Sequence, residues 1–230
     1  MRRALAQKRP YLVLSVVAAL AYHYLQITEL PEAFLWPIKG SACAFLAFYA
    51  WLRHGSSDAR LLAGAMAVAA IADMAMEFDM AVGAGVFILF HILAIRLFTR
   101  HNRGAMAGRD NVVLLALLIV PPFAGYWLPD DQLWSWLAAA YGAFLGVMAA
   151  SAWASDFPRL RVAAGAILFV ISDLLIFARL GPLEGSLIPE YLVWPTYYLG
   201  QFLIAIGVVT TLRKRDPELR VVPGSRETMH

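Results

Sequence analysis

The sequence has little charge and almost no cysteine for its length. Only 15% of its 230 residues are charged, whereas 61% are apolar and the mean hydropathy is +0.65. A soluble domain has about 25% charged and about 45–50% apolar residues, so a water-soluble fold is excluded. The single cysteine, Cys43, has no partner, so no disulfide framework exists.

Several familiar catalytic and binding motifs are also absent. The chain has no His-Glu-x-x-His pair and no Gly-x-Ser-x-Gly turn. His91, Asp73 and Asp173 could together bind a zinc ion, but the spacing typical of zinc sites is missing, so the sequence does not favour one. The basic residues do not form a stripe suited to nucleic acid. We therefore expect no metal, no cofactor and no nucleic-acid partner.

Long apolar stretches dominate what remains. Eight of them are near the length of about 20 residues that crosses about 30 Å of hydrocarbon, and they run approximately over 11–27, 34–53, 60–79, 82–99, 111–128, 132–154, 160–180 and 191–212. All should be helices, because a backbone within lipid must satisfy its own hydrogen bonds. The sequence predicts an all-α polytopic membrane protein. It forms one eight-helix domain over 1–212, followed by a polar, flexible tail over 213–230.

The positive charges indicate the orientation of these spans. If the eight spans alternate in direction, 17 of the 19 Lys and Arg residues lie on one side of the membrane. Arg179 alone lies on the other side, and Lys39 lies inside the second span. The positive-inside rule then places both termini in the cytoplasm. The first segment also resembles a signal peptide with a cleavage site near Ala21, but its apolar run continues to Ile27, which favours a retained span.

A few ionisable residues lie within the spans. Each costs a few kcal/mol on insertion scales, so each is a candidate for function. They are Lys39, Asp73, Glu77, His91 and Asp173, and the last span adds Tyr197, Tyr198 and Gln201. The predicted orientation places Asp73 and Asp173 about 10 Å below the outer surface, at a rise of 1.5 Å per residue. Lys39 should lie nearby, so the outer half of the membrane holds the candidate site.

Structural explanations compete with this hypothesis. A single intramembrane His91 or Gln201 is more often a hydrogen-bonding contact between helices than a catalytic group. Glu77 could lie at the outer interface. Two aspartates and a lysine that converge at one depth are harder to explain structurally, because one Asp–Lys pair leaves the second aspartate unpaired. The convergence favours a functional site.

The polar residues and their neighbours resemble the YhhN-like family of integral membrane proteins, which includes the animal lysoplasmalogenases. The resemblance lies in Lys39, in Asp73, in Gly83-xxx-Phe87-xxx-His91, in the run 165–173 (GAILFVISD) and in the run 197–204 (YYLGQFLI). It covers the chain from about residue 11 to 212. The sequence departs from the family pattern at Ala72, where glycine is usual, at Ala94, where tyrosine is usual, and at Glu77, where an apolar residue is usual.

The resemblance implies hydrolysis of the vinyl ether bond of lysoplasmalogens, which releases a fatty aldehyde and a glycerophospho-base. Such cleavage needs a neutral acid and an anion, and two carboxyl groups in a site of low dielectric constant can supply both. We expect Asp73 and Asp173 to be this catalytic pair, without deciding which is the acid. Lys39 would either bind the phosphate or hold one aspartate ionised. The expected substrate-binding residues are Lys39, Glu77, His91, Tyr197, Tyr198 and Gln201.

A different class of function uses the same residues. A proton-coupled carrier or lipid-binding protein could employ Asp73, Asp173 and Lys39 as a relay. A carrier should have polar groups that reach both membrane faces, whereas the inner halves of these spans carry almost no charge. The enzyme is therefore the favoured hypothesis. Its partners would be a lysophospholipid substrate and membrane lipid, in a bacterial cytoplasmic (inner) membrane.

Overall fold

The computed structural model describes residues 10–28, 31–104, 106 and 108–215. Within these ranges it contains eight helices. They are α2 (Pro10–Leu25), α3 (Glu32–Arg53), α4 (Ser57–Phe78), α5 (Met80–Arg100), α6 (Gly108–Trp127), α7 (Gln132–Ala154), α8 (Val162–Arg179) and α9 (Leu187–Arg215). They follow the eight predicted stretches to within a few residues. The last helix reaches Arg215, three residues into the predicted tail, and the rest of that tail lies outside the described residues.

Six of the helices in the described ranges, α4 to α9, are long and apolar enough to cross a membrane. The apolar helix α2 is shorter, with 16 residues, and α3 interrupts its apolar run with Pro37 and Lys39. The prediction of an all-α polytopic membrane protein is thus confirmed. The count of eight complete crossings remains a prediction.

Local sequence explains where several helices begin. Proline suits the first turn of a helix, because its missing N–H is unsatisfied there in any case, and α2 begins at Pro10. The Ser56 hydroxyl caps α4 by accepting from the Ala59 N–H, and the Asp131 carboxylate caps α7 by accepting from the amides of Leu133 and Trp134. Asp79 separates α4 from α5, and its carboxylate accepts from the Val82 N–H at 2.8 Å. These caps set the short, sharp turns between antiparallel neighbours.

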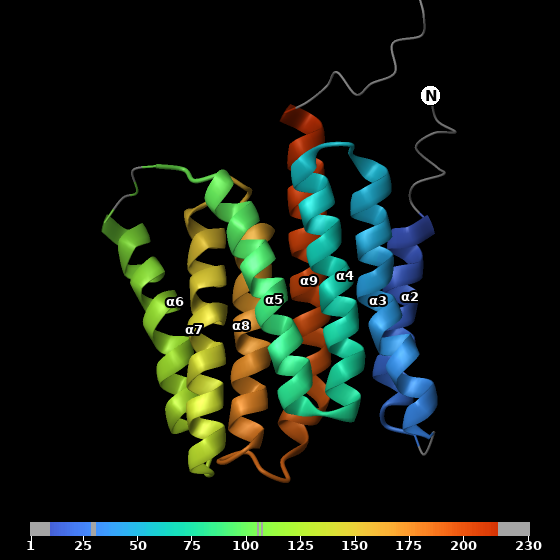
Figure 1. The fold of residues 1–230 in the computed structure, drawn as a ribbon, viewed down its shortest axis with the longest axis vertical. Helices are drawn as coiled ribbons and strands as arrows, with labels where there is room; N and C mark the ends of the chain where they lie inside the picture. Colours follow the sequence, from blue (N-terminus) through green and yellow to red (C-terminus); the bar gives the residue numbers. More distant parts are fainter. Residues whose placement is uncertain (1–9, 29–30, 105, 107, 216–230) are drawn as a thin grey trace, which may run out of the picture.

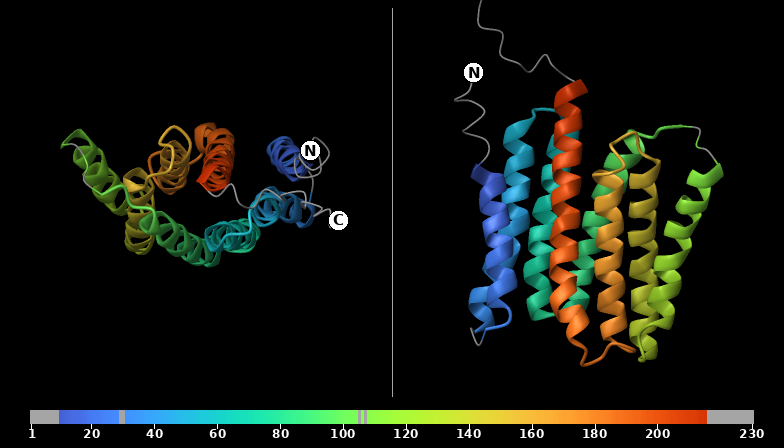
Figure 2. Two further views of the ribbon diagram at one scale, coloured as in Figure 1. Left: turned by 90° about the horizontal axis from the view of Figure 1, so that it is seen from above. Right: turned by 180° about the vertical axis from the view of Figure 1, so that it is seen from behind.

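The helices form two layers (Figures 1 and 2). Seen from above, α6, α7, α5, α4 and α3 follow one another along an arc, and α8, α9 and α2 lie on its concave side. Helix α9 packs against α8 and also contacts α2, α3 and α4. Gly165 on α8 and Gly200 on α9 allow a close crossing, because a Cβ at Gly165 would lie 2.6 Å from the Gly200 carbonyl oxygen. This crossing fixes the two helices that carry Asp173 and Tyr197.

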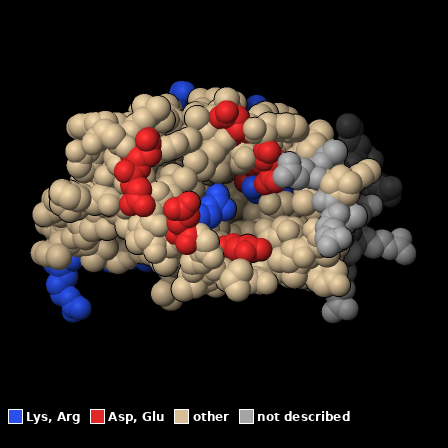
Figure 3. Space-filling model, turned by 90° about the horizontal axis from the view of Figure 1, so that it is seen from below, with Lys and Arg blue, Asp and Glu red and all other residues tan. Residues whose placement is uncertain are grey.

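The two ends of the bundle differ in charge. The chain enters α2 and leaves α9 at the same end (Figure 1). That end, the basic face, includes Arg53, Arg60, Arg100, Arg159, Arg161 and Arg213. The opposite end, the acidic face, carries Asp79, Asp130, Asp131, Glu184 and Glu190. Figure 3 shows Asp and Glu side chains around a hollow at the centre of that face.

Candidate active site

A cavity of about 490 Å³ lies between the two helix layers and opens at the acidic face (Figure 3). We call it the polar cavity. Its walls come from α2, α3, α4, α5, α8 and α9. Its charged lining residues are Lys39, Asp73, Glu77, Asp173, Arg179 and Glu190. The cavity therefore brings both predicted catalytic aspartates and the predicted lysine to one space, from three different helices.

Asp73 reaches this cavity from α4 and is buried. Its Oδ2 accepts a hydrogen bond from the Tyr197 hydroxyl of α9 at 2.9 Å. The same hydroxyl accepts from Nε2 of Gln201 at 3.4 Å, and the Cys43 sulfur lies 3.4 Å away. A buried carboxyl group must be hydrogen-bonded to be tolerated, and Tyr197 meets that need. Gln201 lies one helical turn further along α9, and its hydrogen bond helps to fix the position of the Tyr197 hydroxyl.

Asp173 reaches the cavity from α8 and is also buried. Its Oδ2 accepts from the Tyr141 hydroxyl of α7 at 2.8 Å, and Tyr141 is in turn 3.1 Å from Nε2 of His91 on α5. Since Tyr141 donates its proton to Asp173, its oxygen accepts from His91, which places the imidazole proton on Nε2. Nδ1 of His91 is then a bare acceptor, and it has no hydrogen-bond partner among the described residues.

Aromatic packing connects the two hydrogen-bonded chains. The Phe169 ring lies 5.2 Å from the His91 ring and 5.2 Å from the Tyr197 ring, measured between centroids. Phe87 lies at 5.7 Å from Tyr197 and also lines the cavity. These edge-to-face contacts fix the orientation of both supporting side chains. The aspartates thus project from a rigid wall.

Lys39 does not pair with either aspartate. Its ammonium lies 2.5 Å from Oε1 of Glu77, and the Tyr22 hydroxyl donates to the same oxygen at 2.9 Å. The ammonium also lies 5.3 Å from the centroid of the Tyr22 ring. Glu77 therefore lines the polar cavity as the counter-ion of Lys39.

Arg179 and Glu190 lie at the mouth of the polar cavity. Arg179 is the last residue of α8, and Glu190 lies in the first turn of α9. Both are exposed, and neither has an ion-pair partner among the described side chains. A cation and an anion are thus available together at the opening.

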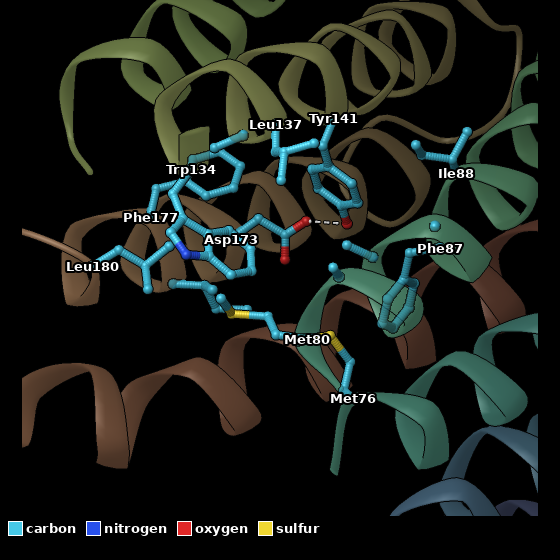
Figure 4. Close-up of a pocket in the computed structure, with 15 residues that line it drawn as sticks. Met76, Met80, Phe87, Ile88, Trp134, Leu137, Tyr141, Asp173, Phe177 and Leu180 are labelled. Atoms are coloured by element: carbon cyan, nitrogen blue, oxygen red, sulfur yellow. Dashed lines mark hydrogen bonds between the residues drawn. The ribbon is translucent and has the colours of Figure 1, made fainter. Parts of the chain in front are cut away.

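A second, apolar space adjoins the polar cavity. This apolar groove of about 210 Å³ lies between the end of α4 and helices α5, α7 and α8. Figure 4 shows Met76, Met80, Trp134, Leu137 and Phe177 around it, with the Asp173 carboxylate directed toward its centre. Four residues line both spaces, namely Met76, Phe87, Asp173 and Ile176. Asp173 is therefore the acid at the junction of a polar and an apolar chamber.

Seven of the eight predicted site residues line the polar cavity or support it, and they form two groups. Asp73, Asp173, Lys39, Glu77 and Tyr197 line the polar cavity. His91 and Gln201 are fully buried behind it and act on the aspartates through Tyr141 and Tyr197.

Tyr198 points elsewhere, because its hydroxyl lies 2.8 Å from the Ser15 hydroxyl on α2.

Three residues that line the two spaces, Tyr22, Tyr141 and Arg179, were not among the predicted site residues. In the predicted topology, Arg179 is notable only as the single cation on its side of the membrane. A single tyrosine in an apolar span forms no motif with its neighbours, so the sequence alone does not indicate that it lines a site. Arg179 could have been found from its isolation, because a cation that breaks the positive-inside pattern needs a reason.

The arrangement suits acid–base chemistry at an interface of polar and apolar surroundings. Two carboxyl groups can exchange protons with a substrate that spans both chambers. In the part of the chain that the structure describes, no group of three His, Cys, Asp or Glu side chains is placed to hold a metal ion.

Comparison with known proteins gives one result. No curated protein and no solved structure matched the chain. The YhhN family matches residues 34–208, which span α3 to α9 and include every residue of both aspartate networks. The chain therefore belongs to the YhhN family.

Proposed function

We propose that this protein is a membrane-embedded hydrolase that cleaves the vinyl ether bond of lysoplasmalogens. The products are a fatty aldehyde and a glycerophospho-base. The observation that carries the proposal is the position of Asp173, which lines the polar cavity and the apolar groove at once. A single-chain ether lysolipid has its vinyl ether where its polar head meets its chain, so that bond would lie beside Asp173.

The two carboxyl groups support a balanced proton cycle. Neutral Asp173 gives its proton to the β-carbon of the vinyl ether, the carbon on the chain side, and an oxocarbenium ion forms. Ionised Asp73 removes a proton from the water that attacks this ion, which gives a hemiacetal. Asp73 then protonates the glycerol oxygen as the carbon–oxygen bond breaks, and Asp173 takes the hemiacetal proton. The aldehyde leaves, and both carboxyl groups return to their first states.

The tyrosines hold these carboxyl groups in place for the reaction. Tyr141 fixes one oxygen of Asp173, so the other remains free to face the substrate. Tyr197 does the same for Asp73. Such positioning is worth several kcal/mol in catalysis, because the reacting groups need no further ordering.

The mouth of the polar cavity suits a zwitterionic head group. The guanidinium of Arg179 presents several N–H donors to a phosphate. Glu190 attracts a positively charged base such as ethanolamine or choline. Arg179 lies six residues beyond Asp173 on α8, about 9 Å along the helix, which a glycerol backbone and the arginine side chain can bridge. Lys39 is occupied by Glu77, so we assign the phosphate to Arg179.

The charge of the two faces supports an orientation. We propose that the basic face lies in the cytoplasm and the acidic face outside, as the positive-inside rule describes. The cavity then opens to the outer surface of a bacterial inner membrane. Lysolipids of the outer leaflet would present their head groups at this opening.

Aldehyde release tests the proposal. Purified full-length protein would be given a lysoplasmalogen in deuterated water, and the aldehyde would be analysed by mass spectrometry. Protonation of the β-carbon predicts one deuterium on the carbon next to the carbonyl group. Asp73→Asn and Asp173→Asn should each reduce release by about 10²–10⁴-fold, the usual contribution of general acid–base catalysis.

Asp130→Asn is the matched control, because it makes the same change on the acidic face away from both chambers. It should retain full activity. Full activity of either cavity variant would refute the two-carboxyl mechanism. If wild-type protein released no aldehyde from any vinyl ether lipid but moved protons across vesicles, the carrier hypothesis would replace the enzyme.

A further inference from the structure

The apolar groove is more than a packing defect beside the polar cavity. It is continuous with the cavity, because Met76, Phe87, Asp173 and Ile176 contribute to both walls. It also reaches the outer surface of the bundle, where Leu137 is 45% exposed. Two openings follow, one into water at the acidic face and one sideways into lipid.

The packing of the helices explains why the groove stays open. Helix α5 packs against α4 and α7, and not closely against α8. Helix α5 lines the space with three small residues, Ala81, Ala84 and Gly85, and with the larger Met80, Phe87 and Ile88. The groove is therefore bounded by bulky side chains of α7 and α8 on one side, and on the other by a helix with a stretch of small residues between Met80 and Phe87 (Figure 4).

We infer that this groove holds the hydrocarbon chain of a single-chain amphiphile, which enters sideways from the membrane beside α5, and that Gly85 sets how much chain fits. The inference rests on the proposed function, since it takes the polar end of that amphiphile to lie in the polar cavity. Charge separation between the two chambers supports this occupant. Among the described residues that line the groove, Asp173 is the one Asp, Glu, Lys or Arg side chain, and it lies at the end where the chain would meet its head group.

The size of the groove limits the occupant to one chain. Its volume of about 210 Å³ accommodates roughly seven groups of the size of water, at about 30 Å³ each. A methylene group is of similar size, so the first part of one chain fills the groove and the remainder continues into lipid. A lipid with two chains beside its head group would leave one chain without a place.

Gly85 is the position at which this limit can be changed. A Cβ added there has no heavy atom within 4 Å, so a larger side chain would extend into open space without displacing a helix. Gly85→Phe should fill the part of the groove that faces α5. Gly64→Phe is the matched control, because Gly64 on α4 is equally exposed and unobstructed but does not line the groove.

The first measurement needs no chemical turnover. The probe is a 1-O-alkyl lysophosphatidylethanolamine with bromine on its chain, which lacks the double bond and so cannot be protonated there. Full-length protein in nanodiscs of dioleoylphosphatidylcholine is titrated with it. Bromine quenches nearby tryptophan, so the difference between wild type and Trp134→Phe reports the groove. Saturable quenching of the Trp134 signal is expected, and its absence would overturn the inference.

The second measurement compares the glycine variants. Each buried methylene changes binding by about fourfold, so displacement of two or more should weaken binding of a long-chain probe at least tenfold in Gly85→Phe. A short-chain probe and the Gly64→Phe variant should be unaffected. Equal affinity of Gly85→Phe and wild type for the long-chain probe would overturn the inference.

The two proposals fail separately. Binding of the chain in the groove without aldehyde release from vinyl ether lipids would refute the hydrolase and leave the chain site standing. Aldehyde release by wild type, together with equal affinity of Gly85→Phe and wild type for the long-chain probe, would support the hydrolase and refute the chain site.

Discussion

The two aspartates differ in the side chains that support them by hydrogen bonds. Asp173 is supported by Tyr141 and His91, and Asp73 by Tyr197, Gln201 and Cys43. Only Asp173 borders the apolar groove. At the scale of single residues, these different surroundings are the basis for giving the two carboxyl groups different roles.

Removal of the Tyr141 hydroxyl should impair the chemical step more than binding. Tyr141→Phe leaves one oxygen of Asp173 and Nε2 of His91 without their hydrogen-bond partner. A buried polar group left unsatisfied in this way costs about 1–3 kcal/mol of free energy. We expect kcat for aldehyde release to fall about tenfold, with KM within about twofold of wild type. The kcat profile against pH should also change, which a purely structural defect would not produce.

Tyr126→Phe is the control for this prediction, because the Tyr126 hydroxyl makes no hydrogen bond within the described ranges. It should leave kcat and KM unchanged. An unchanged kcat and pH profile in Tyr141→Phe would show that Tyr141 does not position Asp173.

Lys39 and Glu77 should stabilise the fold only as a pair. Lys39→Met leaves the Glu77 carboxylate without its counter-ion in a site where the side chain is 18% exposed, and we expect a loss of about 2–4 kcal/mol. The double variant Lys39→Met/Glu77→Gln should recover part of that loss. Thermal unfolding in detergent measures both, with the exposed Arg60→Met as control. A double variant less stable than Lys39→Met would contradict the prediction.

At the scale of helices, the Gly165–Gly200 crossing determines the geometry of the site. It holds α8 against α9 and so sets Asp173 and Tyr197 relative to each other. Neither glycine touches the polar cavity. Their effect on the site is therefore transmitted through the backbone.

A methyl group at this crossing should destabilise the protein. In Gly165→Ala the Cβ would meet the Gly200 carbonyl oxygen at 2.6 Å, and such overpacking costs about 1–3 kcal/mol. The melting temperature in detergent should fall, and aldehyde release should fall with it. Gly64→Ala, where the added Cβ meets open space inside α4, should melt at or above the wild-type temperature, because alanine favours a helix more than glycine does. Equal melting temperatures of the two variants would show that the helix crossing can accommodate the added methyl group.

Helix positions could be predicted from the sequence more fully than their contacts. Apolar runs and breakers such as Pro31 and Asp131 located all eight helices to within a few residues. Distance along each helix also indicates from the sequence that Asp73, Asp173 and Lys39 lie at one end of the bundle, where they line the polar cavity. The pairing of Lys39 with Glu77 could not be predicted, because it depends on how α3 and α4 are rotated against each other.

At the scale of the whole molecule, the separation of charge between the faces predicts a topology. Cys43 is fully buried, so the wild-type chain offers a silent background for thiol labelling. Glu184→Cys on the acidic face should react with a membrane-impermeant maleimide in intact bacterial spheroplasts. Arg60→Cys on the basic face should react only after permeabilisation. The opposite pattern would invert the proposed orientation.

The arrangement of the layers was beyond sequence reasoning. No pattern in the sequence predicts that α5 packs against α7, or that α8 and α9 lie on the concave side of the arc. Those relations create the groove, to which Tyr141 and Gly85 contribute. The sequence indicated the acids and their depth, whereas the second chamber emerged only from the packing.

The two chambers have a consequence for product release in the proposed reaction. A lysolipid cleaved beside Asp173 would yield one product that dissolves in the membrane and one that dissolves in water, and each would already lie at its own exit. The aldehyde would move sideways into the bilayer, while the glycerophospho-base would diffuse out at the acidic face. Neither product would have to pass the other, so the proposed enzyme would separate its products by polarity as it forms them.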